Sequence, residues 1–281
     1  MKILPFKIPK PQPDALILQE DLEDVFYDKL HQHQEIQISL ILSGTGTLLV
    51  GDTVNRFNPN DIVVLGTNLP HVFKSDLSMD QKSHMLTVFF DQNTFGKGFF
   101  EIEELKTLQN FFSFSRSGFK VIEPTEDLKF LFLKMKNVSK LERFVLFFDL
   151  LQKLHKSKKT RLSSFLSNKR YSNTEGNRMS TIFDYTVNHF QEEITLSQIA
   201  KEAALTKTAF CRFFKARTNK TYQQFLKELR LEHACQLLQS EKSQKLIADI
   251  AFECGFNSVS NFNRYFKKEK GVSPLQYRQG F

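Results

Sequence analysis

Basic residues recur at a fixed spacing in the last third of the chain, and their chemistry suits a nucleic acid. Arg212 and Lys215 have counterparts 52 positions later, at Arg264 and Lys267. A guanidinium group can bond O6 and N7 of guanine together, and ammonium groups can bond phosphates. No Ser/His/Asp set, Gly-rich phosphate loop or pair of catalytic carboxylates stands out in the sequence. These residues therefore predict DNA binding rather than catalysis.

The basic residues belong to a module that occurs twice. Its first part repeats at an offset of 51, which matches Ile199, Ala200 and Glu202 with Ile250, Ala251 and Glu253. Its second part repeats at an offset of 52, which matches Phe210, Arg212, Phe214 and Lys215 with Phe262, Arg264, Phe266 and Lys267. One inserted residue in the turn accounts for the change. Each copy predicts a short amphipathic helix, a tight turn and a basic second helix, which is the pattern of a helix-turn-helix unit.

Charge separates the chain into two halves. Residues 1–152 hold 16 Lys and Arg against 20 Asp and Glu, a net charge of −4, whereas residues 153–281 hold 23 against 11, a net charge of +12. We therefore expect only the second half to bind a polyanion. The three cysteines form no CxxC pair, which favours a reducing cytoplasm over a disulfide framework or zinc finger. Neither a secretion signal nor a run of ~20 apolar residues is evident, so no membrane association is expected.

The first half predicts strands and then helices. Short β-rich runs separated by Gly and Pro indicate a barrel or jelly roll, at residues 36–42, 47–50, 62–65 and 85–90. Helical periodicity follows over residues 102–112, 128–135, where Pro124 marks the start, and 141–155. The last of these helices is apolar on nearly every side, so it either packs on the barrel or forms a dimer seam. The polar residues 156–177 are interpreted as a linker.

The basic half predicts a helical bundle. One helix is expected near residues 179–190, and a capping box at Thr195 and Gln198 indicates the start of the next. Further helices are expected at 207–217, at 222–239 and from Ser258 to Lys268. In the second helix of each module, the phenylalanines face the core, which leaves polar and basic residues on the opposite face. Gly255 suits the turn of the second module, and Gly271 suits a helix C-cap, for which Asn219 stands in the first module.

Residues 178–281 resemble the double helix-turn-helix DNA-binding domain of the AraC/XylS family of bacterial transcription regulators. The resemblance rests on three segments: IAFECGF at 250–256, FNRYFKK at 262–268 and GVSPLQYR at 271–278. It implies base contacts from the outer faces of the two recognition helices, by Thr208, Cys211, Arg212, Val259, Ser260, Asn263 and Arg264. Phosphate contacts are expected from Lys207, Lys215, Arg217, Lys267 and Lys268. Cys211 departs from the polar residue expected at its position.

The first half resembles the cupin-like regulatory domain that often precedes this DNA-binding domain. The resemblance rests on His31, His33, Gln37 and Gly44, and on Pro70 followed by His71. In metal-binding cupins two histidines, an acid and a later histidine meet at one ion, but here Gln37 takes the place of the acid. Strict alternation with Ile36, Ile38 and Leu40 would instead turn His33 and Gln37 to water. A polar effector pocket of His31, His33, Gln37 and His71 without metal or cofactor is our interpretation, and a bound metal and surface histidines are the alternatives.

The sequence as a whole predicts an α+β protein, with a cupin-like barrel and helices followed by an all-α double helix-turn-helix domain. The expected domains are a sensing and dimerisation domain at 1–155, a linker at 156–177 and a DNA-binding domain at 178–281. The function predicted is a cytoplasmic, non-enzymatic transcription regulator, by family habit an activator. Its expected partners are promoter DNA, RNA polymerase, a small-molecule effector such as a sugar, and a second copy bound through the Leu141–Leu154 helix. The alternatives are a cupin metalloenzyme with a nucleic-acid-binding tail and an architectural nucleoid protein.

Overall fold

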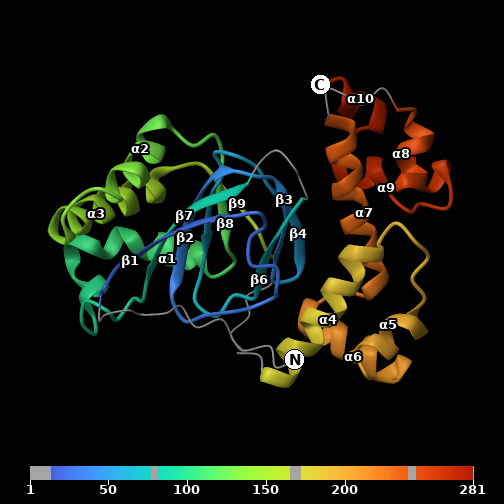
Figure 1. Cartoon of the computed structure of the whole chain (residues 1–281), viewed down its shortest axis with the longest axis horizontal. Helices are drawn as coiled ribbons and strands as arrows, with labels where there is room; N and C mark the ends of the chain where they lie inside the picture. The colour runs from blue at the N-terminus through green and yellow to red at the C-terminus, as the bar shows by residue number, and fades with distance from the viewer. Residues whose placement is uncertain (1–13, 77–81, 165–171, 240–244, 281) are drawn as a thin grey trace. The chain divides into compact units, whose positions relative to one another are not determined.

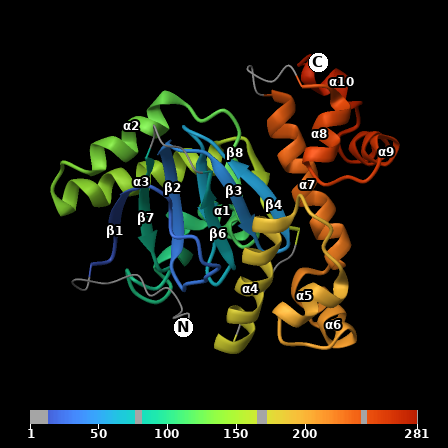
Figure 2. The same cartoon turned by 45° about the vertical axis from the view of Figure 1, so that its right-hand side comes forward.

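A computed structural model describes residues 14–76, 82–164, 172–239 and 245–280. The chain divides into two compact units, Met1–Gly176 and Asn177–Phe281. The first contains every strand of the described chain, and the second contains helices alone (Figures 1 and 2). Each unit is described by itself below.

The first unit is built on two antiparallel sheets. The larger has the strand order β1-β7-β2-β5-β8-β9 and the smaller has the order β4-β3-β6. The strands are β1 (Ile17–Glu23), β2 (Ile36–Ser43), β3 (Gly46–Val50), β4 (Thr53–Phe57), β5 (Ile62–Leu65), β6 (His71–Ser75), β7 (Ser83–Phe90), β8 (Phe119–Val121) and β9 (Lys159–Arg161). One core lies between the sheets, because Leu48, Phe57 and Phe73 of the smaller sheet cluster with Ile41, Val63 and Met85 of the larger. This arrangement confirms the predicted cupin-like barrel.

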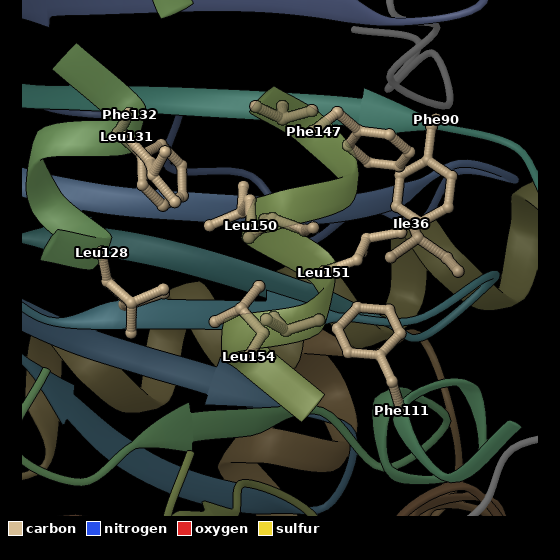
Figure 3. Close-up of a cluster of buried hydrophobic side chains, with 14 of the residues drawn as sticks. Ile36, Phe90, Phe111, Leu128, Leu131, Phe132, Phe147, Leu150, Leu151 and Leu154 are labelled. Carbon is tan, nitrogen blue, oxygen red and sulfur yellow. The ribbon is translucent and has the colours of Figure 1, made fainter. Parts of the chain in front are cut away.

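Helices cover the outer face of the larger sheet. They are the 3₁₀ helices η1 (Phe99–Glu101) and η2 (Glu103–Leu108) and the α-helices α1 (Gln109–Ser115), α2 (Glu126–Met135) and α3 (Lys140–Lys156). Figure 3 shows Phe147, Leu150 and Leu154 along α3, with Phe147 beside Phe90 of β7, and all four belong to one buried cluster with Ile36 of β2. The second core of this unit therefore lies between the sheet and the helices.

Two cores make both faces of β2 buried. Ile36, Ile38 and Leu40 face the helices, so the alternate residues Gln37 and Ser39 face the inside of the barrel and not water. The exposed fraction of Gln37 is 4%. The expectation from strict alternation is therefore wrong here, because the solvated face that it assumes is the barrel interior.

Capping residues set the starts of α2 and α3. The Thr125 hydroxyl accepts a hydrogen bond from Leu128 N, so Thr125 is the N-cap of α2, and Pro124 precedes the cap instead of starting the helix. Ser139 and Glu142 form a capping box for α3. The outer side of α3 is apolar as well: Leu141 and Val145, one turn apart, are 74% and 62% exposed.

The predicted linker is partly wrong, since its first residues belong to the barrel. β9 pairs with β8, and the buried Asp52 carboxylate accepts hydrogen bonds from the hydroxyl groups of Ser163 and Ser164, at 2.6 and 2.5 Å. A three-residue strand of Lys, Thr and Arg has no apolar alternation to reveal it in the sequence. Residues 165–171 of the linker lie outside the described residues, and α4 has already begun at Asn173.

The second unit contains two helix-turn-helix pairs joined by one long helix. Its helices are α4 (Asn173–His189), α5 (Leu196–Glu202), α6 (Lys207–Thr218), α7 (Tyr222–Gln239), α8 (Ile247–Glu253), α9 (Val259–Lys270) and α10 (Pro274–Arg278). Phe225 of α7 packs against Phe183 and Phe214 in the first pair. The later residues Leu231 and Leu238 of α7 pack with the second pair. α7 thus serves both pairs, and its predicted bounds of 222–239 are confirmed.

The sequence repeat is matched by a repeat of hydrogen bonds. At an offset of 51, Leu205 N bonds the Ala200 carbonyl at 2.9 Å and Phe256 N bonds the Ala251 carbonyl at 3.0 Å. At an offset of 52, the C-cap amides of Asn219 and Gly271 bond the carbonyls of Lys215 and Lys267. The insertion that separates the two offsets is therefore confined to the turn before α9.

Candidate nucleic-acid interface and ligand pocket

The two recognition helices, α6 and α9, begin at side-chain caps. The Thr206 hydroxyl accepts from Ala209 N, and the Ser258 hydroxyl accepts from Asn261 N. Phe210 and Phe214 bury one face of α6, and Phe262 and Phe266 bury the same face of α9. The opposite face of each helix is consequently free to contact a groove of DNA.

The residues that the sequence assigns to DNA lie on these open faces. Among the residues expected to read bases, the exposed ones are Thr208, Cys211, Arg212, Ser260, Asn263 and Arg264. Among those expected to bind phosphates, the exposed ones are Lys207, Lys215, Lys267 and Lys268. Val259 and Arg217 are half-buried. Arg264 donates from Nη2 to Asn261 Oδ1 at 3.0 Å, a bond that holds the guanidinium against the first turn of α9. The two faces differ in chemistry, because Thr208 and Cys211 accompany Arg212 on the first, whereas Ser260 and Asn263 accompany Arg264 on the second.

One residue that sequence reasoning missed connects the two helix-turn-helix pairs. Arg230 of α7 donates from Nε to the Phe190 carbonyl and from Nη2 to the Glu192 carbonyl, both at 2.7 Å. Gly255, with a φ of 78°, lies against the same segment, where an added Cβ would approach the Phe190 carbonyl oxygen to 2.7 Å. The end of α4 and the turn of the second pair are therefore locked together at Arg230. A lone Arg in an amphipathic helix gave no signal of this role.

The predicted pocket residues of the first unit also come together. His31 and His71 have ring centroids 4.3 Å apart, and His33 lies 5.1 Å from His71. One ring nitrogen from each of the three histidines lies within 4.8 Å of the others. His33 and His71 are buried and His31 is half-buried, so the interpretation of surface histidines does not hold for His33 and His71.

Backbone carbonyls fix the orientation of each ring. Nδ1 of His31, His33 and His71 lies 2.8 Å from the carbonyl oxygens of Lys29, Glu35 and Leu69 respectively. A carbonyl oxygen only accepts, so Nδ1 carries the proton in each ring and Nε2 presents its lone pair when the ring is neutral. Burial lowers the pKa of His31 to about 4 and lowers the pKa values of His33 and His71 as well. At neutral pH the cluster therefore consists of three uncharged imidazoles.

A polar chain leads from this cluster along the inner face of the larger sheet. Gln37 lies 3.1 Å from His33 Nε2, its amide also bonds Ser39 at 2.9 Å, and Ser39 bonds Thr87 at 2.8 Å. A neutral His33 needs a hydrogen-bond donor at Nε2, and Gln37 supplies one when its side-chain amide is flipped so that the NH₂ group faces the ring. The neutral amide that replaces the expected acid is thus a hydrogen-bond partner of a ring.

A cavity of about 330 Å³ opens beside the cluster. His31 and Gln37 line it, together with aromatic side chains such as Phe26 and Tyr27. Asp21 stands on another wall, where burial raises the pKa of its carboxyl group. Aromatic walls with a few polar groups are the usual composition of a small-molecule site.

Three neutral imidazoles also fit a metal ion of the kind found in cupins. Each ring donates its other N–H to a backbone carbonyl, which is the support that metal-bound histidines normally have. Nε2 of His71 has no hydrogen-bond partner among the described residues, although that side chain is buried. His31, His33 and His71 would hold such an ion, with the Gln37 amide giving up Nε2 of His33 to it, and the ion would supply a Lewis-acidic centre at the wall of the cavity.

These two sites define a two-domain protein in which a ligand-binding barrel is joined to a pair of helix-turn-helix units. A family model described as the AraC-like ligand binding domain matches residues 13–89, and one described as a helix-turn-helix domain matches residues 199–280. The two matches together support an AraC-type regulator with an N-terminal ligand-binding domain.

Curated relatives match parts of the chain. The uncharacterized HTH-type transcriptional regulator YdeC of Bacillus subtilis is 31% identical over 105 residues, 37% of this chain and 35% of that protein. The HTH-type transcriptional activator RhaS of Escherichia coli is 32% identical over 142 residues, 50% of this chain and 47% of that protein. The chain thus spans about a third to a half of the length of these relatives.

Solved structures are similar over different extents. The DNA-binding domain of AdpA in complex with a target DNA is 26% identical and covers 35% of this chain and 87% of its own, with a TM-score of 0.34. ToxT from Vibrio cholerae is 14% identical and covers 94% of this chain and 98% of its own, with a TM-score of 0.37. Among the described residues, no helix is both long and apolar enough to cross a membrane.

Proposed function

We propose that the protein is a DNA-binding transcription regulator whose barrel domain binds a small-molecule effector. The observation that carries this proposal is the pair of helix-turn-helix units, which repeat hydrogen bond for hydrogen bond and leave a basic face of each recognition helix open. The name of the RhaS relative favours activation as the outcome. The family makes the metalloenzyme alternative less favourable, and we place the protein in the cytoplasm.

Within this function, the outer residues of α6 and α9 would read bases and the flanking lysines would bind phosphates. Arg264 is held over the first turn of α9 by Asn261, the region that enters a major groove first. Lys267 and Lys268 lie near the end of α9, where a long flexible ammonium suits the DNA backbone. The differing faces of the two helices argue for an asymmetric site and against an architectural protein without sequence preference.

The experiment that tests this assignment compares Arg264→Ala with Lys267→Ala on arrays of DNA sequences. We expect Arg264→Ala to lose about 1–3 kcal/mol of discrimination at particular base pairs, since an Arg contact to guanine specifies a base. Lys267→Ala should weaken all sequences about equally and reduce the salt dependence. If both variants weaken every sequence alike, Arg264 contacts phosphate. If the unmodified protein shows no sequence preference, the proposed function is wrong.

The barrel would communicate with the DNA-binding domain through a change in which arrangement of the chain or of a dimer is favoured. We propose His31, His33, Gln37 and His71 as the polar wall of the effector pocket, with a sugar among the candidate ligands. We further propose that α3 forms a homodimer seam through its outer residues, because Leu141 and Val145 leave an apolar stripe on the surface. RNA polymerase is the proposed partner during activation.

A further inference from the structure

We propose that His31, His33 and His71 bind a late first-row divalent metal ion and that this ion is itself a regulatory signal, because it closes residues 24–35 over the cavity. The metal site stands on the geometry of the barrel alone. Its regulatory role rests on the function proposed above.

The choice of metal follows from the ligands. The set consists of imidazole nitrogens without a carboxylate, which favours zinc, nickel or copper over magnesium, calcium or manganese. Glu35 has Oε2 4.0 Å from Nδ1 of His33, the nitrogen that already faces a carbonyl, and the set of possible ligand atoms contains only the three histidines. The buried Nε2 of His71 has no hydrogen-bond partner among the described residues, and its lone pair can be donated to a cation.

The position of the ligands links the ion to a movement. Residues 24–35 contain no regular strand or helix and carry both His31 and His33. His71 begins β6 and meets His31 through paired backbone hydrogen bonds of 2.9 and 3.0 Å. Nitrogens bound to one tetrahedral ion lie ~3.4 Å apart, given bonds of ~2.1 Å, whereas the three nitrogens here span up to 4.8 Å. Binding would therefore draw the three side chains together and hold residues 31–33 of the segment against β6.

The same segment forms part of the cavity, which gives the movement a consequence. Phe26 and Tyr27 line the cavity with His31, and Phe26 N bonds the Ser75 hydroxyl at 3.1 Å. An ion that fixes His31 therefore also fixes these two aromatic side chains. Three protein ligands leave a tetrahedral ion with one further position, which a water molecule or an anionic group of a second ligand can take.

The first experiment measures metal binding by the full-length protein, with Zn²⁺ and Co²⁺ as the probes. We expect one ion per chain, a tetrahedral Co²⁺ absorption spectrum without a thiolate charge-transfer band, and affinity at least about tenfold lower in His71→Gln. His84→Gln is the matched control, because His84 is a half-exposed histidine of β7 that bonds Glu20, and it should bind like the unmodified protein. Should His71→Gln misfold by circular dichroism, His33→Gln replaces it. No binding, or equal binding by all variants, overturns the site.

The second experiment measures the consequence of binding. Zn²⁺ should slow protease cleavage within residues 24–35 and change the affinity for a selected DNA site at least about threefold, in the unmodified protein and in His84→Gln but not in His71→Gln. Cleavage that is unaffected by bound metal overturns the closure of the segment. If the protein binds DNA specifically but its affinity does not change when metal binds, the regulatory role is overturned. Absence of specific DNA binding with or without metal overturns the proposed function and leaves the measured metal site standing.

Discussion

At the scale of single residues, the turns of the two helix-turn-helix units place different amino acids at the same left-handed backbone position. Gly255 has a φ of 78°, and its counterpart Ala204 has a φ of 52°. Both stand at the end of the first helix, and their amides bond the carbonyls of Phe252 and Lys201 at 2.8 and 2.9 Å. A left-handed conformation costs an alanine ~1–2 kcal/mol that a glycine avoids. The first turn therefore retains strain that the second does not.

We expect Ala204→Gly to raise the free energy of unfolding by about 0.5–1 kcal/mol, because the strain that it removes exceeds the entropy that glycine adds to the unfolded chain. Gly255→Ala should lower it by more than that, since the new Cβ would also meet the Phe190 carbonyl. Urea denaturation of the two variants measures both changes. If both substitutions changed the free energy of unfolding in the same direction, the two turns would not share one energetic requirement.

Cys211 offers a chemical probe of the first recognition helix. It is exposed, whereas Cys235 and Cys254 are buried, and burial raises the pKa of their thiols to about 11 and about 12. The buried pair should therefore react slowly with iodoacetamide at pH 8, because the thiolate is the nucleophile. We expect specific DNA to protect Cys211 from labelling, as measured by mass spectrometry. Undiminished labelling in a saturated complex would place this face of α6 away from DNA.

The candidate site shows what residue patterns can and cannot predict. The exposed faces of α6 and α9 followed from the spacing of Phe210, Phe214, Phe262 and Phe266, since a helical period separates one face from the other. The inward direction of His33 and Gln37 did not follow, because period two identifies opposite faces without saying which lies in a barrel. The role of Arg230 depends on carbonyls about 40 residues away in sequence, which no local pattern contains.

At the scale of elements, α7 sets the separation of the two recognition helices. Its 18 residues give a length of about 27 Å, close to the ~34 Å of one DNA turn, so α6 and α9 can enter successive major grooves on one side of the duplex. We expect one subunit to protect an asymmetric site of about two turns in a footprinting experiment. Protection of a single half-turn would mean that only one unit contacts DNA.

A proline in this helix tests that dependence. Leu231→Pro should abolish high-affinity binding, because proline inside a helix costs ~3 kcal/mol or more and redirects the residues that follow. Leu231→Ala is the control, since it also removes a buried side chain but leaves the helix continuous. The control should keep the two-turn footprint at a temperature where it remains folded. Loss of binding by both variants to the same degree would attribute the effect to packing and not to the spacing.

At the scale of the whole molecule, the sequence predicted the two architectures and their order but not where one ends. The change from period two to helical period marks barrel and helices clearly. The boundary between the units depends on β9 and on Asp52, which bonds Ser163 and Ser164 from more than 100 residues away. Such long-range contacts leave no mark in the local sequence.

The DNA-binding unit should fold alone, because its helices bury their phenylalanines against one another. We expect a fragment of residues 172–281 to be helical, to unfold cooperatively and to bind DNA. A fragment of residues 177–281 should be ~1 kcal/mol less stable, since it lacks the Ser172 hydroxyl that caps the Glu175 amide. Circular dichroism with thermal unfolding makes the comparison. An unfolded longer fragment would contradict the domain division.

The short strand β9 has a further consequence for the protein in a crowded solution. Without it, β8 would present the open backbone groups of Phe119, Lys120 and Val121 at the rim of a largely apolar sheet, a template on which a strand of another molecule could pair. β9 occupies that template, and its own outer rim is only three residues long and carries Lys159 and Arg161. Two positive charges on so short a rim repel a second copy of the same strand. We therefore expect the basic residues of β9 to limit edge-to-edge pairing through this sheet.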